Sequence, residues 1–114
     1  MIAPQDLEHI KFSEEYVQEI IAKIDESIMR FHGWHSYEYA IVDSELPMRL
    51  RDYIAELYIK SGWTYVYHRT SSENGEKAGL TSFMFSTILL DDRCTKGRYM
   101  VSKVDDEFES TYIV

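Results

Sequence analysis

The chain has 114 residues, of which 45% are hydrophobic, and carries a formal net charge of −8. A chain of this length forms one domain with enough buried apolar surface to fold without disulfides or a metal. Nucleic acid is a poor partner for so acidic a protein, because affinity for the phosphate backbone rests mainly on lysine and arginine.

The N-terminal residues and the cysteine content bear on location. The chain starts without the basic and then apolar order of a signal peptide, and its apolar runs are far shorter than the roughly 20 residues that span a bilayer. The single cysteine, Cys94, cannot form an internal disulfide. We therefore expect a cytoplasmic protein without membrane contact, with one α+β domain over 1–114 and flexible ends at 1–12 and 105–114.

The first periodic segment predicts a helix over 14–32. Ser13 precedes it as a candidate N-cap, and Gly33 follows it as a candidate left-handed C-cap. Its apolar residues recur at three- and four-residue steps, so they share one face of the helix. These residues are Val17, Ile20, Ile21, Ile24, Ile28 and Phe31.

A strand and a second helix follow. Residues 37–42 alternate between larger apolar and other side chains, which predicts a half-buried strand. A helix is predicted over 46–61, because Pro47 suits the first turn of a helix and Gly62 suits its end. Its apolar stripe consists of Leu46, Leu50, Ile54 and Leu57.

The segment that follows has the clearest strand pattern. Trp63, Tyr65 and Tyr67 occupy alternate positions, which predicts three aromatic rings on one face of a strand. Residues 80–90 form a second run with apolar side chains on both faces, so we predict a central strand that is buried on both sides. Between these runs lies a polar segment, 71–79, whose Asn-Gly step indicates a long hairpin with a projecting loop.

The C-terminal part is more charged. Residues 91–97 predict a turn, and 99–103 predict a shorter strand that pairs antiparallel. An acidic segment, 105–109, then precedes 111–114, which is either a frayed tail or an edge strand used for association. We favour the tail because chain ends are commonly poorly ordered.

The order of elements predicts an α+β fold. The expected architecture is a two-layer sandwich, with two helices packed on one face of a mostly antiparallel sheet of about four strands. The aromatic strand face is then either core, as large aromatic side chains often are, or an exposed patch that marks a binding surface.

A group of hydrogen-bonding residues around the hairpin predicts a ligand site. Arg69 and Lys77 provide positive charge, and hydroxyl and backbone N–H groups provide donors, as binding of a small anion or nucleotide requires. The alternative is an ordinary solvated hairpin loop. The candidate residues are His68, Arg69, Thr70, Ser71, Ser72, Asn74, Lys77, Thr81 and Ser82.

Other chemistry finds little support in the sequence. His32 and His35 form an H-x-x-H pattern, but Gly33 between them favours a helix end over a zinc site. No serine, cysteine or carboxylate arrangement typical of a catalytic centre is visible. We predict no catalytic residue, metal or cofactor, and favour binding over catalysis.

Two runs carry a resemblance. L-R-D-Y-I-A-E-L-Y-I-K-S-G-W at 50–63 and H-R-T-S-S-E-N-G-E-K-A-G-L-T-S-F at 68–83 resemble small uncharacterised proteins of tailed bacteriophages. The resemblance implies an accessory protein in the infected bacterial cytoplasm, where many small acidic phage proteins bind and inhibit host factors or defence systems. It assigns no functional residue.

Two functional hypotheses follow. The first is a non-enzymatic protein that binds a host protein through its acidic surface and exposed aromatic side chains. The second is a protein that sequesters a nucleotide or signalling ligand at 68–82, as a homo-oligomer with the site at a subunit boundary. The interface residues predicted for the first hypothesis are Trp63, Tyr65, Tyr67, Asp105, Asp106 and Glu107.

Overall fold

The computed structural model describes residues 12–72 and 79–114. The helices in these residues are α2 (Glu14–Phe31), α3 (Met48–Lys60) and α4 (Asp92–Thr95). The strands are β1 (Glu38–Val42), β2 (Tyr65–Thr70), β3 (Thr81–Ser86), β4 (Tyr99–Val104) and β5 (Glu107–Tyr112). None of these helices is long and apolar enough to cross a membrane.

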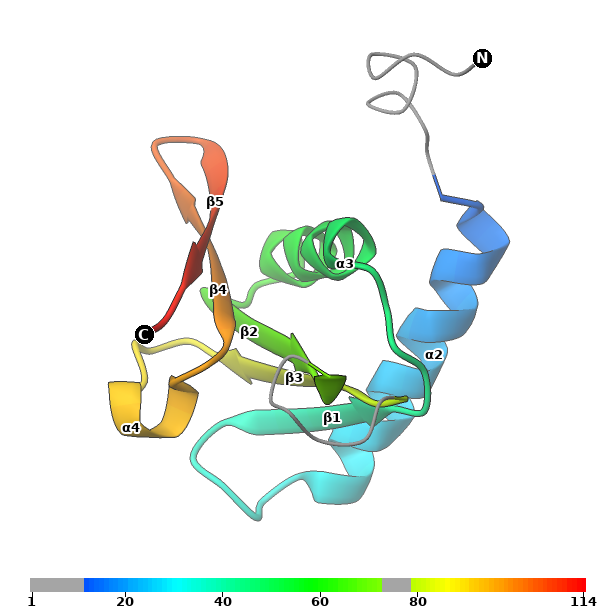
Figure 1. The fold of residues 1–114 in the computed structure, drawn as a ribbon, viewed down its shortest axis with the longest axis horizontal. Helices are drawn as coiled ribbons and strands as arrows, with labels where there is room; N and C mark the ends of the chain where they lie inside the picture. Colours follow the sequence, from blue (N-terminus) through cyan, green and yellow to red (C-terminus); the bar gives the residue numbers. More distant parts are fainter. Residues whose placement is uncertain (1–11, 73–78) are drawn as a thin grey trace.

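The strands form one five-stranded sheet in the order β1-β3-β2-β4-β5 (Figure 1). All the neighbouring strands pair antiparallel. α2 and α3 pack on the same face of this sheet, so the predicted α+β sandwich is confirmed. The sheet has one strand more than expected because the acidic C-terminal segment adds β5.

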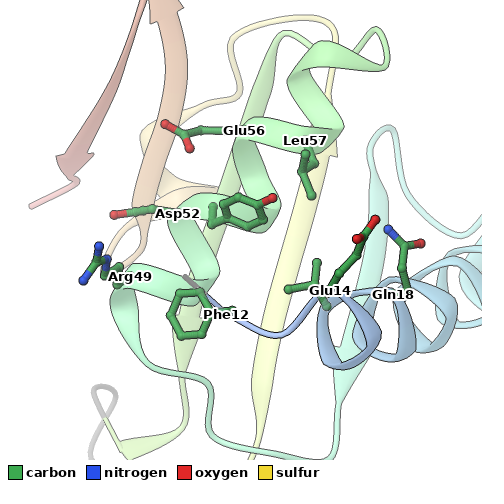
Figure 2. Close-up of a pocket in the computed structure, with 9 residues that line it drawn as sticks. Phe12, Glu14, Gln18, Arg49, Asp52, Glu56 and Leu57 are labelled. Atoms are coloured by element: carbon green, nitrogen blue, oxygen red, sulfur yellow. The ribbon is translucent and has the colours of Figure 1, made fainter. Parts of the chain in front are cut away.

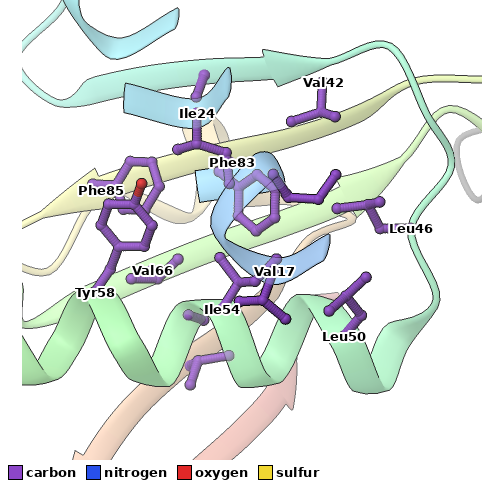
Figure 3. Close-up of a cluster of buried hydrophobic side chains, with 14 residues drawn as sticks. Val17, Ile24, Val42, Leu46, Leu50, Ile54, Tyr58, Val66, Phe83 and Phe85 are labelled. Atoms are coloured by element: carbon purple, nitrogen blue, oxygen red, sulfur yellow. The ribbon is translucent and has the colours of Figure 1, made fainter. Parts of the chain in front are cut away.

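The main core lies between the sheet and these two helices (Figure 3). Phe83 and Phe85 project from the central strand β3 and are fully buried. The helices contribute apolar residues at helical spacing, in agreement with the periodicity of the sequence. Among them are Val17, Ile20 and Ile24 from α2 and Leu50, Ile54 and Tyr58 from α3.

A second, smaller cluster lies on the other face of the sheet, which α2 and α3 leave uncovered. Tyr67, Met84 and Leu90 are buried there. The Tyr67 hydroxyl accepts a hydrogen bond from the backbone N–H of Leu90 at 3.2 Å, which ties the segment after β3 to this face. The half-buried members of the cluster are Tyr37, Tyr39, Tyr65, Met100 and Ile113.

Both long helices lie close to their predicted positions, with different details at the ends. Ser13 is the N-cap residue of α2, as predicted, but its side chain makes no capping hydrogen bond. Gly33 has a φ of 88°, a left-handed conformation that glycine adopts without steric cost, as predicted for the C-cap region. In α3, Pro47 is the N-cap residue and the helix ends at Lys60.

The predicted central strand over 80–90 is shorter than expected. β3 ends at Ser86, whose hydroxyl donates to the carbonyl of Ile88 at 2.7 Å and accepts from its N–H at 3.1 Å. This local turn ends the strand, and it leaves Ile88 62% exposed. Leu80 and Leu89 are also exposed, so burial on both faces holds only within β3.

The prediction that Trp63, Tyr65 and Tyr67 share one face is wrong for Trp63. Trp63 precedes β2 and packs on the helix side, with its ring centroid 5.9 Å from that of Phe85. Tyr65 and Tyr67 lie within β2 and belong to the cluster on the opposite face. The alternation fails because it applies only inside a strand, and β2 begins at Tyr65.

The predicted C-terminal tail is also wrong, since 107–112 form the edge strand β5. Asp105 and Asp106 both have positive φ values, 51° and 67°. Two such residues make the type I′ turn that joins tightly paired antiparallel strands. The turn therefore reverses the chain directly from β4 into β5, which the sequence, without an Asn-Gly step here, did not reveal.

Candidate functional site

The sheet divides the predicted ligand residues between its two faces. His68, Thr70 and Thr81 are buried, whereas Arg69 and Ser82 are only partly buried and are paired across β2 and β3. His68 packs against Phe83 beneath the helices, so Arg69 and Ser82 face the other side. Two further candidates, Asn74 and Lys77, lie outside the described residues.

On the helix side, His68 is part of a buried polar group. The Asp52 carboxylate accepts hydrogen bonds from Nε2 of His68 at 2.8 Å and from the hydroxyl of Ser110 at 3.2 Å. The His68 ring stacks on Tyr99 with centroids 5.8 Å apart. These contacts join α3, β2, β4 and β5, so the position of His68 is that of a structural residue between layers.

The hydroxyls at the base of the hairpin also bind protein groups. Thr81 donates to the carbonyl of Ser44 at 2.6 Å and accepts from the N–H of Leu46 at 2.9 Å. Ser72 donates to the carboxylate of Glu45. Ser71 accepts from the N–H of Leu80 at 3.2 Å. The bonds of Thr81 and Ser72 fasten the hairpin to 44–46, the segment between β1 and α3, and the bond of Ser71 joins the two sides of the hairpin.

The two histidines of the H-x-x-H pattern contact different partners. His32 Nδ1 lies 2.7 Å from a carboxylate oxygen of Glu38, and His35 stacks on Tyr37 with ring centroids 4.9 Å apart. Within residues 12–72 and 79–114, no group of three or more histidine, cysteine, aspartate and glutamate side chains is arranged to hold a metal ion.

A cavity of about 840 Å³ opens between the first turns of α2 and the outer side of α3 (Figure 2). Phe12 and Leu57 give it apolar surface between the two helices. Among the described lining residues, three carboxylates and one arginine make the polar part net acidic. The polar and charged lining residues are Glu14, Gln18, Arg49, Asp52, Tyr53 and Glu56.

Glu56 shows the electrostatic character of this cavity. Burial raises the pKa of Glu56, the neighbouring Asp52 carboxylate raises it further, and Lys60 opposes the shift. A raised carboxyl pKa means that the negative charge lacks sufficient compensation inside the protein. A cation entering the cavity would supply that compensation.

A second cavity, of about 450 Å³, lies further along the same pair of helices and is mostly apolar. Leu57 lines both cavities, so they adjoin at this residue. Trp63 and Met29 line the second one, and Met29 is 76% exposed. We call the two cavities together the interhelical groove.

The acidic residues predicted for an interface lie on the β4–β5 hairpin, whose strand β4 contacts α3. Asp105, Asp106 and Glu107 are exposed at the end of the β4–β5 hairpin. Ser110 of β5 binds Asp52, which itself lines the larger cavity. Of the aromatic residues in the same prediction, Tyr67 is fully buried, so its side chain is core.

Sequence reasoning missed Asp52 and Glu56, and it missed Arg98. Asp52 and Glu56 are four residues apart and so lie on one face of α3, a spacing that could have been noticed. Arg98 is 6% exposed on the uncovered face of the sheet, and its guanidinium donates to the Ser82 hydroxyl at 2.7 Å. Nothing in the local sequence distinguishes Arg98 from a surface arginine.

Comparison with known proteins does not assign this arrangement to a family. No family model matches the chain, and no curated protein sequence or solved structure matches it significantly.

Proposed function

We propose that this chain is a non-enzymatic phage accessory protein that binds a host protein, holding a segment with basic and apolar side chains in the interhelical groove. The supporting observation is the larger cavity, because carboxylates and apolar surface line the same space. A lysine or arginine fits such a site, since its aliphatic stem packs on apolar surface while its charge meets a carboxylate.

The charges of the cavity favour this kind of occupant. Among the described residues, the lining contains three carboxylates, Glu14, Asp52 and Glu56, and one cation, Arg49, so their net charge is negative. The raised pKa of Glu56 also favours a cationic occupant, because a bound cation stabilises the ionised carboxylate. Apolar side chains next to the basic residue would occupy the adjoining cavity beside Trp63 and Met29.

The acidic hairpin supports the same partner chemistry at longer range. Asp105, Asp106 and Glu107 are exposed and lie in a chain with a net charge of −8. Charges outside the contact chiefly accelerate encounter with an oppositely charged surface. In this proposal, these three residues speed the approach of the partner, and the cavity residues hold the partner once it is bound.

Affinity capture from a bacterial host lysate, compared between matched variants, tests this proposal. The groove variant is Glu14→Gln with Glu56→Gln. The control is Glu19→Gln with Glu26→Gln, which removes the same charge from the outer face of α2, where these residues contact Lys23 and Arg30.

We expect the control to retain the same host protein as the unchanged chain, and the groove variant to bind it about tenfold more weakly, a difference of about 1.4 kcal/mol. Circular dichroism verifies that both variants are folded. Equal retention by both variants, or loss of the protein from both, contradicts the groove as the binding site.

A further inference from the structure

Arg98 is a buried cation held in a fixed position on the face of the sheet that α2 and α3 leave uncovered. Its backbone N–H donates to the carbonyl of Thr95 at 3.1 Å, and its carbonyl accepts from the N–H of Ile113 at 2.9 Å. Arg98 immediately precedes β4, and its guanidinium crosses β2 to reach the Ser82 hydroxyl on β3 at 2.7 Å. It also forms a hydrogen bond with Tyr39 of β1.

Arg69 lies beside this guanidinium. It is the cross-strand partner of Ser82, so both arginines converge on that serine. Burial lowers the pKa of Arg98, and the positive charge of Arg69 lowers it further, while Tyr39 and Tyr37 oppose the shift. Two cations therefore share one patch of the sheet.

No carboxylate in the described part of the chain compensates them. Within residues 12–72 and 79–114, neither Arg69 nor Arg98 forms an ion pair. A buried charge is costly unless it is paired, so proteins rarely retain one without a partner. Hydroxyl groups satisfy part of the hydrogen-bonding capacity of Arg98 but supply no negative charge.

We propose that this face of the sheet binds a phosphate group at Arg69 and Arg98, with Ser82 and Tyr39 completing the site. Two adjacent guanidinium groups match a doubly charged anion better than a singly charged one, and a phosphate monoester carries a charge of about −1.5 to −2 at neutral pH. The half-buried Arg69 is the accessible contact, and Arg98 supplies the second charge beneath it.

Aromatic rings next to the site indicate what can accompany the phosphate. Tyr37 and Tyr39 are half-buried on the same face, and Tyr37 stacks with His35 at an interplanar angle of 3°. Flat aromatic surfaces of this kind stack on nucleobases. The phosphate can therefore belong to a nucleotide or be free inorganic phosphate, and the experiment separates these sources.

This site is independent of the interhelical groove, because it lies on the opposite face of the sheet. It retains Arg69 and Ser82 from the ligand residues predicted by sequence and adds Arg98, Tyr37 and Tyr39. The whole chain has a charge of −8, which repels anions at longer range. The two arginines therefore attract a phosphate group only at short range.

The test is NMR titration of the ¹⁵N-labelled full-length chain with three probes: adenosine monophosphate, adenosine and inorganic phosphate. We compare the unchanged chain with Arg69→Gln. The control is Arg93→Gln, which removes a positive charge from a side chain that is 92% exposed in α4.

We expect adenosine monophosphate to shift the amide signals of Arg69, Ser82 and Tyr39, and Arg69→Gln to weaken binding at least tenfold while Arg93→Gln changes it less than twofold. Adenosine should bind at least tenfold more weakly. If inorganic phosphate binds as tightly as the nucleotide, the site is one for free phosphate; weaker binding of phosphate identifies a nucleotide site.

Three results would overturn the proposal. They are no shifts on this face with any phosphate probe at millimolar concentration, equal binding of adenosine and its monophosphate, and equal affinity of Arg69→Gln and the unchanged chain. Arg69→Gln tests the site without removing the buried Arg98, and the dispersion of the amide spectrum verifies that it is folded.

Discussion

Phe85 is the residue on which most aromatic packing in the core converges. Its ring centroid lies 4.7 Å from that of Tyr58, 5.9 Å from that of Trp63 and 6.0 Å from that of Phe83. We expect Phe85→Ala to lower the free energy of unfolding by about 3–5 kcal/mol in urea denaturation, because a large buried ring leaves a cavity. Met29→Ala, at an exposed position, should change it by less than about 0.5 kcal/mol; similar losses in both variants would contradict this core.

Tyr58 gives a second residue-scale prediction, through its bond to Asp25. The Tyr58 hydroxyl donates to the Asp25 carboxylate at 2.6 Å. Burial, followed by this hydrogen bond and the negative charge, raises the Tyr58 pKa far above its usual value of 10.0. Tyr58→Phe should lower the free energy of unfolding at pH 7 by about 1.5–3 kcal/mol, as expected for a hydrogen bond to a charged group.

The same bond predicts a pH dependence. Above pH 10 the unfolded tyrosine loses its proton while folded Tyr58 keeps it, so this contribution is complete below pH 10 and decreases as the pH rises. The difference in unfolding free energy between the unchanged chain and Tyr58→Phe should shrink by up to about 1.4 kcal/mol per pH unit. Urea denaturation between pH 8 and 11 measures this; a constant difference would contradict the raised pKa.

At the scale of elements, the β4–β5 hairpin depends on a turn made of two aspartates. Asp106 has a φ of 67°, which glycine adopts freely and β-branched residues avoid. Asp106→Gly should raise the free energy of unfolding by up to about 1 kcal/mol, and Asp106→Val should lower it by about 1–2 kcal/mol. The contact of Asp106 with Lys103 is solvent-exposed and contributes little.

Thermal denaturation measures this order of stability. Glu107→Val is the matched control, because Glu107 lies within β5 and a strand accommodates valine. If Glu107→Val is as destabilising as Asp106→Val, the loss reflects the removed charge or added apolar surface, not the backbone conformation of the turn.

At the scale of the whole molecule, the net charge of −8 should control how fast the proposed basic partner associates. Neutralising Asp105, Asp106 and Glu107 to the corresponding amides should reduce the association rate constant several-fold and leave the dissociation rate constant nearly unchanged, because exposed charges act mainly before contact. Surface plasmon resonance with the captured host protein at low and at 0.5 M salt measures both constants. A change confined to the dissociation rate would place these residues inside the contact.

The sequence alone predicted the α+β fold and both long helices, because these features follow from local patterns. A helix repeats every 3.6 residues, so the stripe from Val17 to Phe31 identified α2 without knowledge of its neighbours. The strands were predicted less completely. β5 was missed because its pairing with β4 depends on the turn at Asp105 and Asp106, which lacks the usual asparagine-glycine signal.

Only the tertiary structure decided which side chains meet. Arg69 and Arg98 are 29 positions apart in the sequence. They converge on Ser82 of β3 because β2, which carries Arg69, lies between β3 and β4 in the sheet, and Arg98 reaches across it. The groove combines Glu14 of α2 with Glu56 of α3, and Trp63 joins the core because β2 starts two residues later. Local patterns specify which face of its own element a residue occupies; what lies opposite that face depends on the packing of elements distant in the sequence.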